Sequence, residues 1–459
     1  MKYRLGALLA LGVFWFPVFN ACFFWDDRKL VLDNSHLNSL SEIFLHDLTW
    51  TAQTGGGTPF YRPLMLLSLA IDQKLWPGWA PGYHVWGLLL HLIASYFILR
   101  LGESRAGPGG GLIAAGFFAL HPIQTEAVAW VSARNDPLSA VGIFGALWAL
   151  EQGFFWRGML FAALGMFSKE TAVLLPIFWA GWCFGGGKRP GMREVLGLLG
   201  VVGLFLGARG LAGVNAPAAV EQSLLMAQSR WFLVPVTMLS WLCWPVPTST
   251  ASLYQPLPGP IVPMLCSLVG LFWLVRQSPR KTGSLVALSG IAVLPAVGAA
   301  LATTLIGERY IYVPMGFLGI ALGGELTKFW SPRVRIMLSS FGVLMGVLVG
   351  LQLLLWREER ELVEAAYRRR PDPYSAFRVG HVRHLEKDAK GAFSAMYAAA
   401  SGDPPFLGAC TPAVGMLRDI GAEEQARKLA EELKPACSTR EDFRAMTADF
   451  SSSEPTPVP

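Results

Sequence analysis

The sequence has few charged residues and lacks the motifs of soluble nucleotide-dependent enzymes. Asp, Glu, Lys and Arg together make up only 15% of its 459 residues, against about a quarter in typical soluble domains. No Gly-rich loop is followed by Lys-Ser or Lys-Thr, and the Gly109-Gly110-Gly111 turn leads into apolar sequence instead. A P-loop nucleotide site is therefore not expected.

The six cysteines are too scattered to form a metal site. The sequence has no Cys-x-x-Cys and no His/Cys cluster at metal-ligand spacing, so we predict no bound metal and no other cofactor. Four cysteines lie in or beside apolar segments and are interpreted as small hydrophobic fillers: Cys22, Cys183, Cys243 and Cys266. Cys410 and Cys437 lie in a polar region, and they could form a disulfide if that region faces an oxidising compartment.

Hydrophobic residues dominate the composition. They account for 53% of the chain, which includes 17 Trp and 28 Phe, and the mean hydropathy is +0.42. This composition is typical of a polytopic membrane protein with aromatic residues at the interfaces. The net charge of +6 comes from basic residues dispersed in short loops, which is a topology signal rather than a nucleic-acid-binding surface. We therefore expect membrane lipid, and no nucleic acid, among the partners.

Twelve apolar segments predict an all-α helical bundle in the membrane. They are 5–24, 83–101, 110–121, 137–151, 154–168, 171–187, 195–211, 229–246, 261–276, 284–306, 310–327 and 336–356. Several are shorter than the roughly 20 residues that a single span needs, so tilted or broken helices are expected. Segment 229–246 contains Pro235 and Pro245, with Pro247 just after it, and is interpreted as a re-entrant or interfacial helix. This leaves about eleven true spans.

Basic residues predict the orientation of the bundle. They recur between alternate segments on one side, which the positive-inside rule makes cytoplasmic. The first long loop, 25–82, and the C-terminal region then share the outer face. Lys2 and Arg4 before an apolar segment resemble a signal peptide, but Asn20 and the aromatic residues after it fit no cleavage site, so an uncleaved first span is expected. The sequence has no Asn-x-Ser/Thr sequon, which favours a bacterial inner membrane with a periplasmic outer face.

The C-terminal part of the chain differs in composition from the membrane domain predicted at 1–356. Over 357–450, Arg, Glu and Ala recur at helical spacing, and proline-containing breaks follow one another at roughly 32-residue intervals. This pattern suggests a soluble region with two tetratricopeptide-like helical hairpins, although an irregular helical tail fits nearly as well. Residues 451–459 are rich in Ser, Pro and Thr and are predicted to be disordered.

Two adjacent carboxylates, Asp26 and Asp27, directly follow the first apolar segment. Two neighbouring carboxylates in a partly dry site cannot both ionise easily, so the pKa of one is raised and it can act as a general base near neutral pH. The alternative is that the pair simply marks a solvated helix end.

Further polar residues lie at the predicted outer ends of helices. They are Arg62, His84, His121, Arg134, Asp136, Lys169, Glu170, Glu308, Arg309 and Tyr310. Residues of both signs at one membrane face suggest a site for a charged ligand with a lipid tail, with Arg and Lys holding a phosphate. Each has a structural alternative: a hairpin ion pair for Lys169-Glu170, a helix end for His121-Pro122, an interfacial anchor for Glu308-Arg309-Tyr310. Residues 122–134 are predicted to form a short interfacial helix.

The order of these residues along the chain is characteristic. The motifs are Trp25-Asp26-Asp27, Phe60-Tyr61-Arg62-Pro63-Leu64, Pro81-Gly82-Tyr83-His84, Leu90-His91-Leu92, the long block from Ala119-Leu120-His121-Pro122 to Ala133-Arg134-Asn135-Asp136, Ser168-Lys169-Glu170-Thr171-Ala172 and Glu308-Arg309-Tyr310-Ile311-Tyr312. Together they resemble the transmembrane and tetratricopeptide-repeat O-mannosyltransferases of the GT-C glycosyltransferase superfamily. The resemblance is strong over roughly 13–185, fair at 300–325 and thin elsewhere.

This resemblance implies transfer of a mannose-like hexose from a polyprenyl-phosphate donor to a hydroxyl of a protein or glycan acceptor on the outer face. It maps the presumed base onto Asp26 or Asp27, with inversion at the sugar and no metal. The donor phosphate would lie against Arg62, Arg134, Lys169 or Arg309. The chain departs from the family in its short C-terminal region, which puts the acceptor class in doubt. The alternatives are a non-catalytic membrane scaffold with a protein-binding tail and a transporter of lipid-linked sugar.

Overall fold

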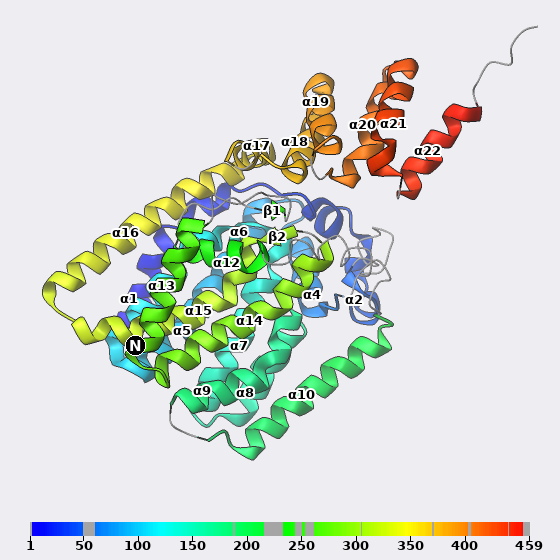
Figure 1. Cartoon of the computed structure of the whole chain (residues 1–459). Helices are drawn as coiled ribbons and strands as arrows, with labels where there is room; N and C mark the ends of the chain where they lie inside the picture. The colour runs from blue at the N-terminus through cyan, green and yellow to red at the C-terminus, as the bar shows by residue number, and fades with distance from the viewer. Residues whose placement is uncertain are drawn as a thin grey trace, which may run out of the picture. The chain divides into compact units, whose positions relative to one another are not determined.

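A computed structural model of the protein confirms the predicted all-α class (Figure 1). It describes residues 2–48, 60–186, 189–214, 233–243, 250–252, 261–303, 305–369, 371–402, 405–438 and 440–452. Within these ranges the extended elements are two three-residue strands, β1 (Thr250–Ser252) and β2 (Leu305–Gly307). The chain divides into two compact units, one formed by Met1–Pro247 with Leu257–Arg357 and one by Thr248–Pro256 with Glu358–Pro459.

Each predicted apolar segment overlaps a helix of the first unit, but 83–101 and 110–121 share one long helix, and residues 63–75 of the first long loop form a further helix outside these segments. In chain order the longer helices are α1 (Lys2–Val13), α4 (Pro63–Leu75), α5 (Ala80–Leu120), α7 (Asn135–Glu151), α8 (Phe155–Met166), α9 (Leu175–Gly185), α10 (Met192–Leu211), α12 (Leu233–Cys243), α13 (Ile261–Gln277), α14 (Lys281–Thr303), α15 (Tyr312–Leu326) and α16 (Pro332–Leu354). Among the described residues four helical stretches are long and apolar enough to cross a membrane: Ala80–Leu120, Met192–Leu211, Lys281–Gly298 and Pro332–Arg357. The number of about eleven spans stays a prediction.

The two segments predicted at 83–101 and 110–121 are the two halves of α5. The helical geometry is interrupted at Ala106 and Gly107, and Gly107 has a φ of +70°, which glycine adopts without strain. The two halves of α5 pack closely against each other. The contact leaves no room for a side chain at Gly111, where an added Cβ would lie 2.6 Å from the carbonyl oxygen of Leu99. Small residues at such a contact let two membrane helices approach backbone to backbone.

The core of the first unit lies where α5, α7, α9 and α15 meet. Phe144 of α7 and Phe178 of α9 both pack on Phe317 of α15, with ring centroids 5.2 Å apart in each case. Almost every residue of α7 is buried, including its polar first turn. Asp136, one of the polar residues predicted as a site, belongs to this buried first turn.

The first predicted span, 5–24, is not one continuous helix. It consists of α1 and a 3₁₀ turn, η1 (Phe16–Asn20), which begins beside Pro17, a residue without a backbone N–H to continue the α-helical ladder. The chain is then tied to the end of α16, because the backbone N–H of Cys22 donates to the carbonyl of Trp356 at 2.8 Å and Phe24 packs on the Trp356 ring. The first long loop therefore starts next to Trp356, one residue before the first unit ends at Arg357.

The second unit is helical throughout its described residues after Arg357. Its helices are α17 (Glu359–Arg369), α18 (Pro373–Leu385), α19 (Ala389–Ala400), α20 (Cys410–Asp419), α21 (Glu423–Cys437) and α22 (Glu441–Ser452). Helices α18 with α19 and α20 with α21 form two hairpins. Ala392 and Ala426 are both fully buried and stand 34 positions apart in the numbering, which is the period of tetratricopeptide repeats. The predicted disordered stretch 451–459 begins inside α22, and 453–459 lie outside the described residues.

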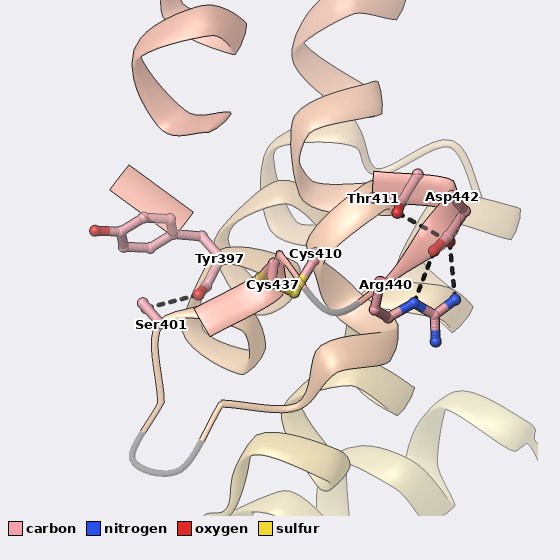
Figure 2. Close-up of a disulfide and its surroundings, with 7 residues drawn as sticks. All are labelled: Tyr397, Ser401, Cys410, Thr411, Cys437, Arg440 and Asp442. Atoms are coloured by element: carbon pink, nitrogen blue, oxygen red, sulfur yellow. Dashed lines mark hydrogen bonds and ion pairs between the residues drawn. A yellow bond between two sulfur atoms is a disulfide. The ribbon is translucent and has the colours of Figure 1, made fainter. Parts of the chain in front are cut away.

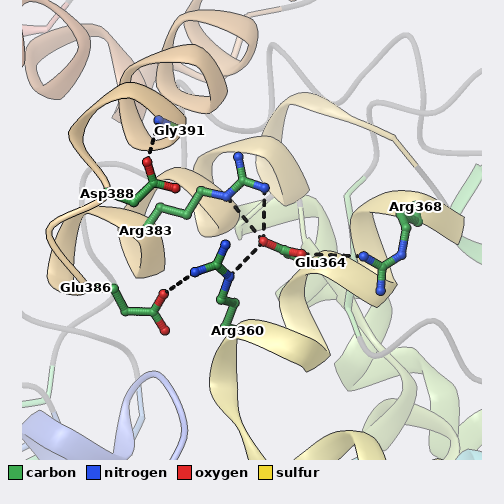
Figure 3. A network of polar contacts seen from close by, with 7 residues as sticks. All are labelled: Arg360, Glu364, Arg368, Arg383, Glu386, Asp388 and Gly391. Carbon is green, nitrogen blue, oxygen red and sulfur yellow. Dashed lines mark hydrogen bonds and ion pairs between the residues drawn. The ribbon is translucent and has the colours of Figure 1, made fainter.

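An ion-pair network joins α17 to α18 (Figure 3). Glu364 accepts hydrogen bonds from Arg360 at 3.1 Å and from Arg383 at 2.9 Å, and Arg360 also pairs with Glu386 at 2.8 Å. Several charges that share partners lose less side-chain entropy per pair than isolated surface pairs. The network fixes the first helix of this unit to the hairpin that follows.

The two cysteines of the second unit form a disulfide, which answers the question that their spacing left open (Figure 2). Cys410 at the start of α20 is bonded to Cys437 at the end of α21, and both are fully buried. The bond closes the second hairpin across a sequence separation of 27 residues. Next to it Asp442 accepts from Thr411 at 2.9 Å and pairs with Arg440 at 2.8 Å, which fixes the start of α22.

We predict that replacing Cys410 and Cys437 together by Ser destabilises the second unit. In the chain-entropy account a cross-link over a loop of this length contributes about 3–4 kcal/mol to the free energy of unfolding. The measurement is the rate of limited proteolysis within 358–452 in the purified full-length protein, with and without reductant. Reductant should accelerate cleavage of the wild type and of a Cys266→Ser control, but not of the double variant. Equal cleavage of wild type and double variant without reductant would contradict the stabilising role.

Candidate functional site

The structure separates the two adjacent carboxylates that follow the first apolar segment. Asp26 is exposed, whereas Asp27 is fully buried. Asp27 Oδ2 accepts from the backbone N–H of Phe24 at 2.9 Å, and its Oδ1 accepts from the backbone N–H of Ser132 at 2.8 Å and from the Ser132 hydroxyl. Trp25, which lies in a turn between Phe24 and Asp26, has a φ of +50°. Asp27 therefore clamps the loop to the segment around Ser132, and Asp26 is held at its surface.

Burial dominates the protonation of Asp27. Loss of hydration raises the pKa of the Asp27 carboxyl to about 7, although the three hydrogen bonds that it accepts act in the opposite direction. The neighbouring charge of Asp26 raises the pKa slightly further. The sequence predicted that one carboxyl of this pair would titrate near neutrality, and the structure assigns this to Asp27.

The segment that holds Asp27 is part of the core. Residues 122–133 form three short helical turns, η4 (Pro122–Gln124), α6 (Thr125–Ala129) and η5 (Val131–Ala133), and every residue from 121 to 136 is buried. The prediction of an interfacial helix here was wrong, because later parts of the chain cover the segment. Trp130 links it to the first loop by donating from Nε1 to the carbonyl of Phe24 at 3.1 Å.

Arg134 forms a buried ion pair with Asp72. Its guanidinium lies 2.5 Å from the carboxylate of Asp72 on α4 and donates to the carbonyl of Tyr83 at 2.9 Å. The Asp72 and Arg134 side chains are 0% and 1% exposed. Burial lowers the pKa of Arg134, and the Asp72 charge partly restores it. This placement does not favour the predicted contact of Arg134 with a donor phosphate.

Two other predicted cations, Arg309 and Lys169, lie together and are partly exposed. Arg309, in the turn η7 (Glu308–Ile311), pairs with Glu126 of α6, and Lys169 pairs with Asp136 at the start of α7. Arg309 also lies 4.6 Å from the centroid of the Trp130 ring. The cation side chains keep 21% of their surface exposed in Arg309 and 11% in Lys169. These two pairs form a nearly neutral cluster, which we name the Arg309–Lys169 cluster.

The charge states in this cluster are set by the opposing effects of burial and of neighbouring carboxylates. Burial alone would lower the pKa of Arg309, but Glu126, with smaller contributions from Tyr310 and Asp136, outweighs it and raises the pKa. Burial lowers the pKa of Lys169, and Asp136 only partly offsets this. Asp136 Oδ2 is buried and accepts no hydrogen bond from the described residues.

Arg62 forms a third pair at the edge of the cluster. Its Nε and Nη2 donate to one carboxylate oxygen of Glu170 at 3.1 and 2.9 Å, and the other oxygen accepts from the backbone N–H of Tyr61 at 3.2 Å. Glu170 begins the turn η6 (Glu170–Leu174), directly after Lys169. The positive charge of Arg62 lowers the pKa of Lys169, so the Arg62–Glu170 pair lies beside the other two pairs.

The remaining predicted residues have mainly structural surroundings. His84 is buried and its Nε2 contacts the carbonyl of Ala21 at 3.0 Å. His121 is buried at the end of α5, where its Nδ1 accepts from the backbone N–H of Ile123 at 3.3 Å. Glu308 is fully buried. Tyr310 is half-buried, and Lys169 Nζ lies 5.7 Å from the centroid of its ring, so Tyr310 belongs to the Arg309–Lys169 cluster.

Three residues of this region were not singled out from the sequence: Glu126, Asp72 and Ser132. A carboxylate inside an apolar segment, as Glu126 is in Thr125-Glu126-Ala127-Val128-Ala129, was the available signal, because such a charge needs a partner. Asp72 and Ser132 carried no comparable signal. Within the described ranges no three His, Cys, Asp or Glu residues are grouped as a metal site requires.

We predict that Arg134→Met destabilises the protein more than the double change Asp72→Leu with Arg134→Met. Removing one partner leaves a buried uncompensated charge, which typically costs about 3–5 kcal/mol, whereas an apolar replacement of both partners is often close to neutral. The measurement is the unfolding temperature of purified protein in detergent. Arg62→Met serves as the control, since its pair with Glu170 is partly exposed. Equal losses for the single and the double variant would show that the pair is not the source of the effect.

We further predict a specific pH dependence from Asp27. Because the pKa is raised to about 7 in the folded protein, the folded state binds the Asp27 proton more tightly than the unfolded state does. The stabilisation is complete below the unfolded pKa of about 4, and it is lost as the pH rises towards 7. The free energy of unfolding of the wild type relative to Asp27→Asn should therefore fall over this range. Asp26→Asn should keep the wild-type slope. A relative stability that rises with pH would mean that the hydrogen bonds outweigh burial.

Comparison with known proteins gives partial sequence matches. No protein-family model matches the chain. The protein O-mannosyl-transferase Tmtc2 of Drosophila melanogaster is 30% identical over 180 residues, which cover 35% of this chain and 19% of the fly protein. The protein O-mannosyl-transferase TMTC4 of Mus musculus is 32% identical over 176 residues, which cover 34% of this chain and 23% of the mouse protein. The chain thus spans about a fifth of the length of these curated relatives.

Among solved structures, the crystal structure of ArnT from Cupriavidus metallidurans bound to undecaprenyl phosphate aligns with 83% of this chain and 79% of its own, at 13% sequence identity and a TM-score of 0.46. The relationship to known proteins rests on the sequence matches alone. They confirm the resemblance read from the motifs: over about a third of its length the chain is related to the transmembrane and tetratricopeptide-repeat O-mannosyltransferases.

Proposed function

We propose that the chain is a membrane glycosyltransferase that moves a mannose-like hexose from a polyprenyl-phosphate donor to an acceptor hydroxyl. One observation carries the proposal. The loop with Asp26 and Asp27 is clamped by Ser132 and Trp130 to the same segment that holds the Arg309–Lys169 cluster. A carboxylate and a group of cations are thereby fixed to one rigid support, as transfer from a phosphate leaving group requires.

We assign the general base to Asp26 and a positioning role to Asp27. A base must reach the acceptor, and Asp26 is the exposed carboxylate of the pair. Asp27 already accepts from Phe24 and twice from Ser132, so its lone pairs hold the loop in place. A carboxylate held by such fixed donors orients its neighbour without itself meeting the substrate.

The proposed reaction is a single displacement. The acceptor oxygen forms a bond to the anomeric carbon of the donor while Asp26 takes the hydroxyl proton. The bond between the anomeric carbon and the phosphate oxygen breaks, and polyprenyl phosphate leaves with the electron pair. One displacement inverts the configuration at the sugar. General base catalysis of this kind contributes roughly 10²–10⁴ in rate.

Arg309 and Lys169 are the proposed partners of the donor phosphate. Both side chains are partly exposed, and the raised pKa of Arg309 keeps the guanidinium charged. Fixed cations stabilise a leaving phosphate without reorganising during the reaction.

The site is proposed to face an oxidising compartment, such as the periplasm. Two features support this sidedness. The second unit contains the Cys410–Cys437 disulfide, and structural disulfides persist in oxidising compartments. The backbone N–H of Cys22, just before the Asp26 loop, donates a hydrogen bond to the carbonyl of Trp356. Trp356 stands two positions before Glu358, from which the C-terminal part of the second unit continues along the chain. Reduced Cys410 and Cys437 in protein isolated from intact cells would contradict this placement.

The helical hairpins of the second unit are proposed to present the acceptor. Their second helices, α19 and α21, begin 34 positions apart, which is the period of tetratricopeptide repeats, and such stacked hairpins form extended concave binding surfaces. The relatives named O-mannosyl-transferases are much longer than the matched region, so the acceptor of this chain, protein or glycan, is left to experiment.

The decisive measurement is turnover of polyprenyl-phosphate hexoses by purified protein in nanodiscs, with candidate peptide and glycan acceptors. Asp26→Asn should lower turnover by about 10²–10⁴ with the unfolding temperature unchanged. Asp27→Asn should lower the unfolding temperature as well, because an amide N–H₂ would face the backbone donors of Phe24 or Ser132.

Asp33→Asn, in the same loop but outside the proposed site, is the control and should retain full turnover. Full turnover of Asp26→Asn would contradict the assignment of Asp26 as the general base. Donor binding without turnover under any condition would favour the scaffold or the transporter over the transferase.

A further inference from the structure

A second ligand site is suggested by an apolar groove in the membrane-spanning region. The groove has a volume of about 770 Å³ and lies between α1, α5, α15 and α16. Its walls are almost wholly hydrophobic, with Phe14, Leu112, Leu326 and Phe341 among them. This volume is within the range of about 300–1,000 Å³ that is usual for small-molecule sites. Of the residues predicted as a site from the sequence, the buried His121 lines it, and none of the residues assigned to the proposed transferase reaction does.

One end of the groove is polar and basic. Arg335 and Ser339 line the groove and also line a second hollow of about 380 Å³, formed with Pro332, Ile336 and Ser340 on the first turns of α16. Arg335 is exposed, and within the described part of the chain its guanidinium forms no ion pair. Trp330, which also lines the groove, is 43% exposed and lies just before α16, where interfacial tryptophans are found.

The basic end lies far from the proposed transferase site. Arg335 and Trp356 are 21 positions apart along α16 and the turn that follows it, which at 1.5 Å per residue is about 30 Å. This distance equals the thickness of the hydrocarbon core of a bilayer. Since Cys22 and the Asp26 loop are tied to Trp356, Arg335 lies at the opposite membrane face.

We propose that the groove and the adjoining hollow bind an anionic phospholipid of the leaflet opposite to the transferase site. An acyl chain would fill the apolar groove, and the phosphate would lie against Arg335 with Ser339 as a hydrogen-bonding partner. The donor lipid is a poorer fit, because its phosphate must reach the Arg309–Lys169 cluster at the other face. A bound phospholipid would pack α16 against α1 and α5, and α16 is the helix that holds the start of the Asp26 loop.

The groove offers a substitution that fills it without disturbing the fold. Gly116 of α5 lines the groove, and a Cβ added there would meet no atom within 4 Å. Gly116→Leu therefore places a side chain in the volume assigned to the acyl chain. Gly200→Leu on α10 is its matched control, because a Cβ added to Gly200 also meets nothing and this residue lines neither hollow.

The test is titration of the purified full-length protein in detergent with dioleoyl phosphatidylglycerol and with dioleoyl phosphatidylcholine, followed by native mass spectrometry and by the unfolding temperature. Phosphatidylglycerol should bind the wild type more tightly. Arg335→Gln should lower its affinity about fivefold, towards that of phosphatidylcholine, since one basic side chain near the membrane surface contributes about that factor. Arg333→Gln, at an arginine that lines neither hollow, should leave the preference intact. Gly116→Leu should weaken both lipids, and Gly200→Leu should weaken neither.

Equal effects of Arg335→Gln and Arg333→Gln, or unchanged lipid binding in Gly116→Leu, would overturn the proposal. Full displacement of phosphatidylglycerol by undecaprenyl phosphate, with loss of donor turnover in Gly116→Leu, would assign the groove to the donor instead. Because the titration measures lipid binding and not turnover, its result does not depend on whether the protein has the proposed transferase activity.

Discussion

The clamp between Asp27 and Ser132 is the interaction on which the candidate site depends. Asp27 is fully buried, and it accepts hydrogen bonds from the backbone on both sides of the contact, at Phe24 and at Ser132. A buried carboxylate without such donors would be strongly destabilising, and with them it fixes two segments that are about 100 residues apart in sequence. Trp130 reinforces the same contact through the carbonyl of Phe24. The first loop, the buried turns and the cluster therefore behave as one support.

Electroneutrality is the second constraint. Arg134, Arg309, Lys169 and Arg62 each have a carboxylate partner, namely Asp72, Glu126, Asp136 and Glu170. An apolar bundle cannot bury an isolated charge at low cost, so pairing is the condition under which so many ionic side chains persist there. The pairs differ in exposure, and this difference separates their roles. The fully buried Asp72–Arg134 pair fixes α4 to the bundle, whereas the partly exposed Arg309 and Lys169 are the proposed partners of the donor phosphate.

The helical class and the positions of most helices of the first unit could be predicted because local sequence determines them. Apolar segments of membrane length and proline-containing breaks give the helices, and the motif from His121 to Asp136 marks the segment at the centre of the site. Partners could not be predicted in the same way. Nothing in the spacing of Asp72 relates it to Arg134, and the interfacial helix expected at 122–134 became a buried set of turns because distant helices cover it. Packing over long sequence separations decides such contacts.

The sequence by itself determined that this is a helical membrane protein with a separate polar helical region, because hydropathy and helical periodicity depend only on neighbouring residues. It also placed two carboxylates together after the first apolar segment. Only the tertiary structure decided that Asp27 is buried and Asp26 is exposed, and that Cys410 meets Cys437. The physical reason is that desolvation and hydrogen-bond partners depend on what packs against a residue, and adjacent residues on a turn face different surroundings.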